Sequence, residues 1–336
     1  MKTYAIVLAA GKGTRMESVL PKCAVPLFSK PMIEYLIDSL EQSSVDKIIV
    51  VVGYKKEVIE KLLKQRVQYV LQEEQLGTGH AVLCAKEAVG EEGRSIIIPG
   101  DTPLIDLEII NNLIKTHEDA QNALTLGTIF LDQPGAYGRI VRSETGRFLR
   151  IVEAKDAEPE ILKIKEINSG LYCVDNKFLF SFLNQVKNNN ASGEYYLTDI
   201  VEMIANSAQV GTFTIKEAYR LKGINDKETL LEVEKAMQEK INFDLMHRGI
   251  KIIDPTSVKI GPDVKVGKGV TIHPNCKITG RTSIGEGATV GPDSELHNVE
   301  LGANVICAHA TLWNCKVKEN EIVLPYSCQK LEESEV

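Results

Sequence analysis

Up to about residue 225, short apolar runs alternate with longer segments in which apolar residues recur every three or four positions. The short runs predict buried strands at Tyr4–Ala9, Lys47–Val52, Val67–Leu71 and Ser95–Pro99. The longer segments predict amphipathic helices at Met32–Gln42, Lys55–Lys64, Gly79–Ala88 and Leu107–Asp119. This alternation is typical of an α/β fold, in which a mostly parallel sheet carries helices on both faces.

A different period begins near residue 250. Aliphatic residues then recur at every sixth position, at Ile260, Val266, Ile272, Ile278, Ile284, Val290 and Leu296. Glycine follows four of these seven residues. A six-residue repeat is the signature of a parallel β-helix, in which the aliphatic side chains point inward and stack between coils. The register shifts by one residue at Leu301, resumes through Cys307 and Trp313, and fades after Pro325.

The two periods divide the chain into four predicted stretches. Residues 1–225 form the α/β domain, and 226–249 form a helical linker built on the long helical segment Asp226–Arg248. Residues 250–325 form the β-helix, and the Glu-rich residues 326–336 form a tail that we expect to be frayed. A length of 336 residues agrees with more than one domain.

Composition excludes several classes of protein. A net charge of −7 without a basic stripe argues against a nucleic-acid partner. The longest apolar runs have the length of a strand, so no membrane span is expected, and no signal-peptide pattern follows the N-terminus. Seven widely spaced cysteines without a C-x-x-C pair predict reduced thiols, and neither a disulfide framework nor a zinc site. These features predict a cytoplasmic protein.

A glycine-rich loop follows the first predicted strand. It reads Leu8-Ala9-Ala10-Gly11-Lys12-Gly13-Thr14-Arg15-Met16. The backbone N–H groups of such a loop can approach phosphate oxygens, although the same glycines would also suit a plain tight turn. The spacing is neither G-x-G-x-x-G nor a Walker A loop. Lys12, Arg15 and the nearby Lys22 place three cations around the loop, which favours phosphate binding.

The run LAAGKGTRM, followed by PK and by PMIEY, resembles sugar-nucleotide pyrophosphorylases. The segments Gln72–Ala81 (QEEQLGTGHA) and Asn188–Asp199 (NNNASGEYYLTD) resemble bacterial N-acetylglucosamine-1-phosphate uridyltransferases, and the resemblance runs to about residue 325. It implies a Rossmann-like nucleotidyltransferase domain followed by a short left-handed β-helix. It also implies that UTP and N-acetylglucosamine 1-phosphate are the substrates, and that UDP-N-acetylglucosamine and pyrophosphate are the products.

The resemblance implies a nucleotide site and three catalytic residues. The nucleotide-binding residues would be Leu8, Ala9, Ala10, Gly11, Gly13, Thr14, Gln72, Gly77 and Thr78. The catalytic residues would be Arg15, Lys22 and Asp101. The amide of Gln72 can donate and accept at the uracil edge, whereas the alternative is a solvated residue at a strand end. Arg15, Lys22 and the loop amides would hold the triphosphate during in-line attack on the α-phosphorus.

Asp101 and Asn225 are the metal ligands that the resemblance implies. Asp101 follows a predicted strand, and Asn225 lies in a Gly-Ile-Asn segment. A triphosphate substrate needs Mg²⁺, which one or two protein oxygens commonly hold together with phosphate oxygens. The alternative for Asp101 is a helix cap before Leu104.

The sugar site that the resemblance implies comprises Gly100, Gly138, Glu153 and Asn168. Glu153 and Asn168 suit sugar hydroxyls, and Gly138 would let main chain approach the N-acetyl group. The alternatives are that Gly138 serves a turn and that Glu153 is surface charge. Pro99 departs from the family pattern, which has an aromatic residue before Gly-Asp, and this keeps glucose 1-phosphate open as the sugar substrate.

In the bifunctional relatives the β-helix carries an acetyltransferase. Here Pro325–Lys330 lacks the expected arginine, and His309 lies too early in the repeat to be the base, so we expect no acetyltransferase activity. The β-helix would instead support self-association as a trimer. Three alternatives stay open: a pyrophosphorylase for glucose 1-phosphate or dTTP, a non-catalytic sugar-nucleotide-binding assembly protein, and a separate chain that supplies the acetyltransferase.

Overall fold

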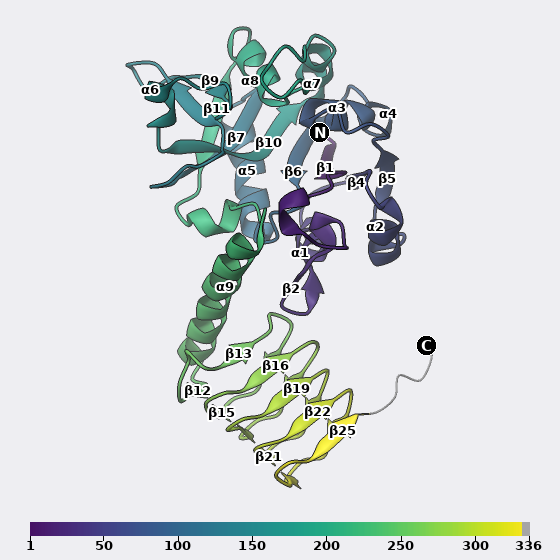
Figure 1. The fold of residues 1–336 in the computed structure, drawn as a ribbon, viewed down its shortest axis with the longest axis vertical. Helices are drawn as coiled ribbons and strands as arrows, with labels where there is room; N and C mark the ends of the chain where they lie inside the picture. Colours follow the sequence, from purple (N-terminus) through teal and green to yellow (C-terminus); the bar gives the residue numbers. More distant parts are fainter. Residues whose placement is uncertain (331–336) are drawn as a thin grey trace. The chain divides into compact units, whose positions relative to one another are not determined.

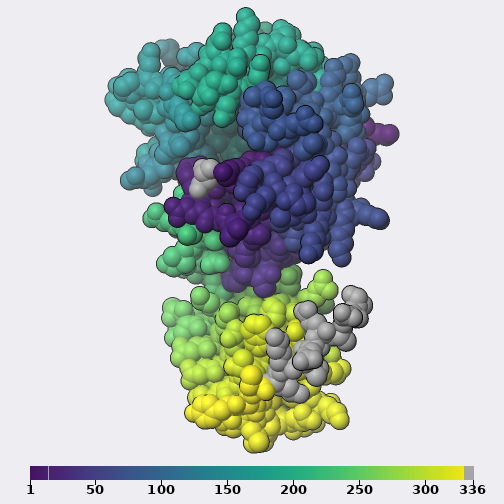
Figure 2. Space-filling view, turned by 45° about the vertical axis from the view of Figure 1, so that its right-hand side comes forward, coloured from purple at the N-terminus to yellow at the C-terminus, as the bar shows by residue number. Residues whose placement is uncertain are grey.

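The computed structural model describes residues 1–330, except for the side chains of Thr14, Gln329 and Lys330. Two compact units are present (Figures 1 and 2). The first contains Met1–Val25 and Pro31–Thr229, and the second contains Pro26–Lys30 and the chain from Leu230 onward. The predicted boundaries at residues 225, 249 and 325 stay predictions.

The first unit is built on a nine-stranded sheet with the strand order β11-β7-β10-β6-β1-β4-β5. Its strands are β1 (Thr3–Ala9), β4 (Lys47–Val52), β5 (Gln68–Leu71), β6 (Arg94–Pro99), β7 (Leu124–Phe130), β8 (Arg139–Arg142), β9 (Phe148–Val152), β10 (Glu166–Asp175) and β11 (Val210–Thr214). The four predicted strands are β1, β4, β5 and β6, and they pair in parallel. β10 is antiparallel to both β6 and β7, and β8 and β9 pair antiparallel beside it.

Helices cover both faces of this sheet. They are α1 (Met32–Glu41), α2 (Lys56–Leu63), α3 (Thr78–Cys84), α4 (Lys86–Val89), α5 (Leu107–Asp119), α6 (Pro159–Leu162), α7 (Asn176–Leu183) and α8 (Thr198–Ala205). Val7 and Val50 pack against α1, α2 and α5, whereas Ile6 and Ile49 pack against α3, α4, α7 and α8. Because both faces are buried, the central strands β4 and β6 carry runs of consecutive apolar residues, as the sequence predicts. The predicted fold class is confirmed.

Several short elements connect the longer helices and strands. Three 3-10 helices are present in the described residues, η1 (Thr14–Met16), η2 (Lys22–Ala24) and η3 (Ala218–Leu221). The two-stranded pair β2 (Pro26–Leu27) and β3 (Lys30–Pro31) lies between η2 and α1. One predicted helix, Gly79–Ala88, is wrong in detail. The predicted helix is divided at Ala85 into α3 and α4. Ala85 is fully buried, so the apolar face continues across the break.

Helix α9 (Lys227–His247) leads into the repeats, which form three stacks of short parallel strands (Figure 1). These strands are β12 (Lys251–Ile252), β13 (Lys259–Ile260), β14 (Lys265–Val266), β15 (Thr271–Ile272), β16 (Lys277–Thr279), β17 (Ser283–Ile284), β18 (Thr289–Val290), β19 (Glu295–His297), β20 (Glu300–Leu301), β21 (Ile306–Cys307), β22 (Thr311–Trp313), β23 (Lys316–Val317), β24 (Ile322–Val323) and β25 (Cys328–Lys330). All seven predicted hexad aliphatics are buried between coils, as a β-helix requires.

Strand pairing explains the shift of register at Leu301. Ile278 pairs with Leu296, eighteen residues on, whereas Ile284 pairs with Leu301, seventeen residues on. The coil has lost one residue at a corner, so the aliphatic side chain still points inward.

The last described strand, β25, lies beyond Pro325. β25 pairs in parallel with β22, so the strand pattern continues past Pro325 into the stretch predicted to be a frayed tail. Residues 331–336 of that tail lie outside the described residues.

His309 lies at a corner with a φ of 52°, and its Nδ1 is 3.4 Å from Asp293 Oδ2. The handedness of the coil stays a prediction. None of the helices in the described part of the chain is long and apolar enough to cross a membrane.

Candidate active site

A cavity of about 390 Å³ in the first unit brings together most of the predicted site residues. The predicted residues that line it are Leu8, Ala10, Gly11, Lys22, Gln72, Gly77, Thr78, Asp101, Glu153 and Asn168. It lies where β1, β5 and β6 end, which is where a parallel sheet places its ligands. Among the other predicted residues, those not in its lining are Ala9, Gly13, Arg15, Gly100, Gly138 and Asn225, and the side chain of Thr14 lies outside the described part of the structure.

Four polar side chains from distant parts of the sequence meet at one side of this cavity. Lys22 Nζ donates hydrogen bonds to Asp101 Oδ2 and, at 2.6 Å, to Asn225 Oδ1. The guanidinium of Arg15 donates to the same Asn225 oxygen at 2.9 Å. The side chains of Lys22 and Asp101 are only 15% and 14% exposed, so their charges are poorly screened by solvent.

Backbone contacts fix the two predicted metal ligands next to each other. The main-chain N–H of Ile224 donates to Asp101 O at 3.0 Å, and this holds the segment that bears Asn225 against the end of β6. The first helix after Asp101, α5, begins at Leu107, and its N-cap is Asp106, which accepts from Ile109 N at 3.1 Å, whereas the carboxylate of Asp101 accepts from Lys22. The carboxylate and amide oxygens of Asp101 and Asn225 converge on one ammonium group. Such an oxygen pair suits Mg²⁺ completed by phosphate oxygens and water.

The glycine-rich loop passes close to Lys22. A Cβ on Gly13, whose φ is +64°, would lie 2.5 Å from Lys22 Cβ, so only glycine fits there. A Cβ on Gly11 would meet nothing within 4 Å, and this leaves open space beside the loop. The Nζ of Lys12 lies 5.5 Å from the centre of the Tyr54 ring, so this cation is held at the ring. Phosphate binding by the loop stays a prediction.

Gln72 is not the solvated strand-end residue of the alternative interpretation. It is 3% exposed, and its Nε2 lies 3.1 Å from Gly77 O and 3.1 Å from His80 Nδ1. Gly77 has a φ of +111°, and a Cβ there would lie 2.7 Å from Tyr195 O. Tyr195 N also donates to Leu76 O at 2.8 Å. The two segments that resemble the family therefore touch each other through main chain.

Glu153 and Asn168 lie in the same cavity with defined partners. Glu153 Oε1 accepts a hydrogen bond from Thr198 Oγ1 at 3.1 Å, and burial together with Asp156 and Asp199 raises the pKa of its carboxyl. Asn168 Nδ2 donates to Tyr172 OH at 2.6 Å. Glu153 is therefore a cavity residue, and the surface-charge alternative is wrong.

Neighbouring side chains lie so close to Gly138 that a larger residue would clash with them. A Cβ there would lie 2.9 Å from Ile151 Cγ2 and 3.4 Å from both carboxylate oxygens of Glu153. Its φ is not among the positive values, so Gly138 does not adopt a left-handed conformation that would require glycine. Gly138 O accepts from Asn168 N at 2.9 Å, which links the predicted sugar residues.

Several lining residues were missed by sequence reasoning. They are Cys23, Gln75, Ala81, Pro99, Gly170, Tyr172, Glu194, Leu197 and Thr198. Gln75, Ala81, Glu194, Leu197 and Thr198 lie in the two segments that resemble the family, but no role was assigned to them, and Pro99 was noted as a departure from the family pattern. A Cβ on Gly170, which has a φ of +80°, would lie 2.9 Å from Pro99 Cγ. Burial, reinforced by Asp101, raises the pKa of the Cys23 thiol to about 12, so it stays protonated at neutral pH. Proximity to Lys22 was the one signal that could have pointed to Cys23.

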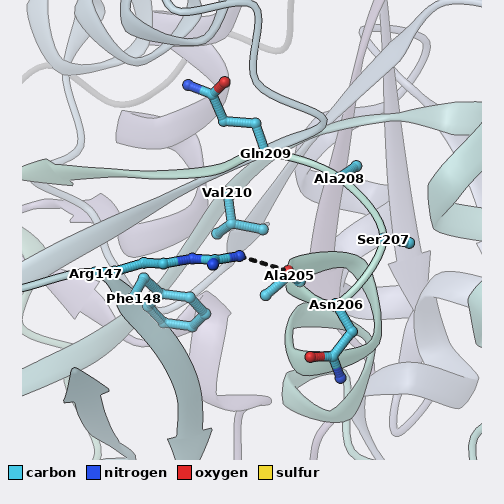
Figure 3. Close-up of a pocket in the computed structure, with 8 residues that line it drawn as sticks. All are labelled: Arg147, Phe148, Ala205, Asn206, Ser207, Ala208, Gln209 and Val210. Carbon is cyan, nitrogen blue, oxygen red and sulfur yellow. Dashed lines mark hydrogen bonds between the residues drawn. The ribbon is translucent and has the colours of Figure 1, made fainter. Parts of the chain in front are cut away.

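A second hollow, of about 520 Å³, contains none of the predicted residues. It lies between the start of β9, the end of α8 and the start of β11 (Figure 3). Arg147 extends across it and donates to Ala205 O at 3.4 Å. It lies away from the polar cluster, so the candidate active site is the first cavity.

Comparison with known proteins decides the family. Residues 5–151 match the MobA-like NTP transferase domain. The chain is 46% identical over 328 residues to the bifunctional protein GlmU of Acholeplasma laidlawii, covering 97% of this chain and 71% of that protein. It is 40% identical over 323 residues to the GlmU of Thermoanaerobacter pseudethanolicus, covering 96% and 70%. The chain belongs to the GlmU family.

Solved structures agree with this GlmU fold. A UDP-glucose pyrophosphorylase complexed with UDP-glucose matches with a TM-score of 0.59 and 21% identity, over 71% of this chain and 100% of that chain. The apo form of a UDP-glucose pyrophosphorylase matches with a TM-score of 0.58 and 19% identity, over 71% and 99%. At these identities the likeness shows the fold. The predicted resemblance to bacterial N-acetylglucosamine-1-phosphate uridyltransferases is confirmed by the GlmU sequence relatives.

Proposed function

We propose that this chain joins N-acetylglucosamine 1-phosphate to the uridylyl group of UTP and releases pyrophosphate, with Mg²⁺ as cofactor. Membership of the GlmU family makes it a sugar-1-phosphate uridylyltransferase. The observation that carries the proposal is the meeting of Lys22, Asp101 and Asn225 beside a single cavity. The same cavity is lined by Gln72, the predicted base-reading residue, and by Glu153 and Asn168 of the predicted sugar site.

The chain's own residues supply positioning and charge. Lys22 and Arg15 would neutralise the phosphates and the departing pyrophosphate, while Gln72 holds the base and Glu153 the sugar hydroxyls. Magnesium held by Asp101 and Asn225 would supply further positive charge at the reacting phosphates. The sugar phosphate is already an anion at pH 7, so its attack on the α-phosphorus needs no general base.

Pyrophosphate release tests this function and its alternatives. Purified protein would be assayed with Mg²⁺, with either UTP or dTTP, and with either N-acetylglucosamine 1-phosphate or glucose 1-phosphate. We expect clear preference for UTP with the N-acetylated sugar. Preference for glucose 1-phosphate or dTTP would overturn the substrate and keep the reaction, and silence with every pair would support the binding-protein alternative.

Gly138→Ala is expected to raise KM for the sugar phosphate roughly tenfold, because displaced groups near a substrate lose much of their positioning effect. The added Cβ would lie too close to Ile151 and displace the main chain beside Glu153. KM for UTP should change less than about twofold. The matched control is Gly261→Ala, whose Cβ meets only ordinary contacts at 3.4 Å and beyond. Equal changes in both KM values would contradict a sugar-side role.

The raised pKa of Glu153 predicts a pH effect on sugar binding. A carboxyl with a raised pKa takes up its proton at a higher pH than an ordinary glutamate. As the pH falls through that value, the carboxylate that accepts from sugar hydroxyls is lost, and kcat/KM for the sugar phosphate falls. Glu153→Gln should lower kcat/KM and remove this part of the acid limb. The sugar phosphate takes up its own proton in assays of both the natural protein and Glu153→Gln, so part of the fall at low pH remains in both. If the two proteins showed the same fall of kcat/KM at low pH, Glu153 would not be the titrating group.

The remaining expectations stay predictions. They are a cytoplasmic location, a role in UDP-N-acetylglucosamine supply for peptidoglycan and cell wall biogenesis, a trimer formed through the β-helix, no nucleic-acid or membrane partner, and no acetyltransferase activity. An assay with acetyl-CoA and glucosamine 1-phosphate tests the last of these.

A further inference from the structure

The segment that bears Asn225 has no regular secondary structure of its own. Gly223, Ile224 and Asn225 lie between η3 and α9, and their position depends on a few specific contacts. Ile224 is fully buried, and its N–H donates to Asp101 O. Gly223 is also buried, so its main-chain N–H requires a partner inside the protein.

That partner is the phenol of Tyr137. Gly223 N donates to Tyr137 OH at 3.2 Å, across 86 positions of sequence. A Cβ on Gly223 would lie 3.2 Å from Asp101 Oδ2, so the phenol reaches main chain that directly adjoins the carboxylate. Burial and the negative charge of Asp101 raise the pKa of Tyr137, which keeps the phenol neutral at working pH.

Tyr137 is itself held firmly. Its ring packs against the core shared with α1 and α5, and its N–H closes a turn on Pro134 O at 3.2 Å. The guanidinium of Arg139, which is 3% exposed, donates to the carbonyl oxygens of Tyr137, Gly135 and Leu162. The buried guanidinium of Arg139 therefore binds the main chain of the loop that bears Tyr137. The phenol of Tyr137 is not used in these contacts and accepts from Gly223 N.

We propose that Tyr137 is a positioning residue that fixes Asn225 beside Asp101 by accepting the Gly223 N–H. Its side chain is not among those that line the cavity, so it acts through the Asn225 segment. Gly138, the next residue, contacts the sugar side through Asn168. The short Tyr137–Gly138 stretch thus ties the metal ligands to the sugar site. This inference rests on the proposed function for its activity readout.

Tyr137→Phe removes the accepting oxygen and keeps the ring. We expect Mn²⁺, titrated into protein saturated with UDP-N-acetylglucosamine and followed by electron paramagnetic resonance, to bind roughly three- to tenfold more weakly, as loss of one hydrogen bond to a buried group implies. The Mg²⁺ concentration for half-maximal turnover should rise by a similar factor, while KM for UTP changes less than about twofold. The matched control is Tyr69→Phe, which removes a hydroxyl that donates to Lys64 O at 2.7 Å on the surface.

A double-mutant cycle separates positioning from general loosening. If Tyr137 acts through Asn225, Tyr137→Phe should weaken Mn²⁺ binding in the natural chain and add nothing in an Asn225→Ala background. Unchanged Mn²⁺ affinity in Tyr137→Phe, or full additivity with Asn225→Ala, would overturn the inference. If the natural chain binds Mn²⁺ and UDP-N-acetylglucosamine as described but shows no turnover, the proposed function fails while the cycle still decides the role of Tyr137.

Discussion

Asp101→Asn is expected to lower kcat roughly 10²- to 10³-fold, the range seen when one preorganised electrostatic group is removed from an active site. The substitution keeps the shape of the side chain and removes its negative charge. Asp101 is the only carboxylate of the polar cluster formed by Arg15, Lys22 and Asn225 in the described residues. Without that charge, Mg²⁺ loses its strongest protein ligand, so Mn²⁺ binding by the protein should weaken as well. Steady-state kinetics and Mn²⁺ titration together measure both effects.

Asp132→Asn is the matched control for this change. Asp132 is exposed at the end of β7 and pairs with Lys165 at 2.8 Å, away from the cavity. A surface pair of this kind contributes little to stability, so activity and Mn²⁺ affinity should stay close to those of the natural chain. An Asp101→Asn enzyme that retained full Mg²⁺-dependent turnover would contradict the proposed metal site.

Lys22→Met is expected to lower kcat roughly a hundredfold or more, by loss of a cation that stabilises charge on the reacting phosphates. Methionine keeps most of the aliphatic stem that packs next to Gly13. In the free protein, the ammonium of Lys22 occupies the oxygens of both Asp101 and Asn225. Its removal should therefore leave Mn²⁺ affinity unchanged or increase it, opposite to the effect of Asp101→Asn.

This contrast distinguishes a phosphate-binding lysine from a merely structural one. Lys47→Met serves as the control, because Lys47 is exposed and its Nζ donates to Ala88 O at 3.3 Å, away from the cavity. If Lys22→Met lowered turnover and Mn²⁺ affinity together, the lysine would be needed to build the metal site. If turnover were unchanged, its proposed role at the phosphates would be wrong.

Strong periodicity made parts of the fold predictable from sequence. The apolar runs of β1 and β4 identify strands that are buried on both faces, and the hexads identify the coils of the β-helix. The antiparallel direction of β10 could not be predicted, because pairing direction depends on where the chain returns. The strand beyond Pro325 was missed because Cys328–Lys330 carries no hexad aliphatic and pairs through its backbone.

The candidate site was predictable where residue type and chemistry coincide. Lys22, Asp101 and Asn225 were expected together on the strength of family resemblance, and the structure brings them together. Contacts that involve main-chain N–H and C=O groups cannot be predicted from the pattern of side chains, because every residue carries these groups. The support of Asn225 by Tyr137 and the contact of Gly77 with Tyr195 therefore emerge only when the chain is folded.

The most direct test of the account is the identity of the uracil-containing product. Purified protein, UTP, Mg²⁺ and N-acetylglucosamine 1-phosphate would be incubated together. The nucleotides would be separated by ion-exchange chromatography and identified by mass spectrometry. The account predicts UDP-N-acetylglucosamine and pyrophosphate in equal amounts, and roughly a hundredth or less of each product from Asp101→Asn at the same enzyme concentration and time. Folded protein that binds UTP but forms no nucleotide sugar would contradict it.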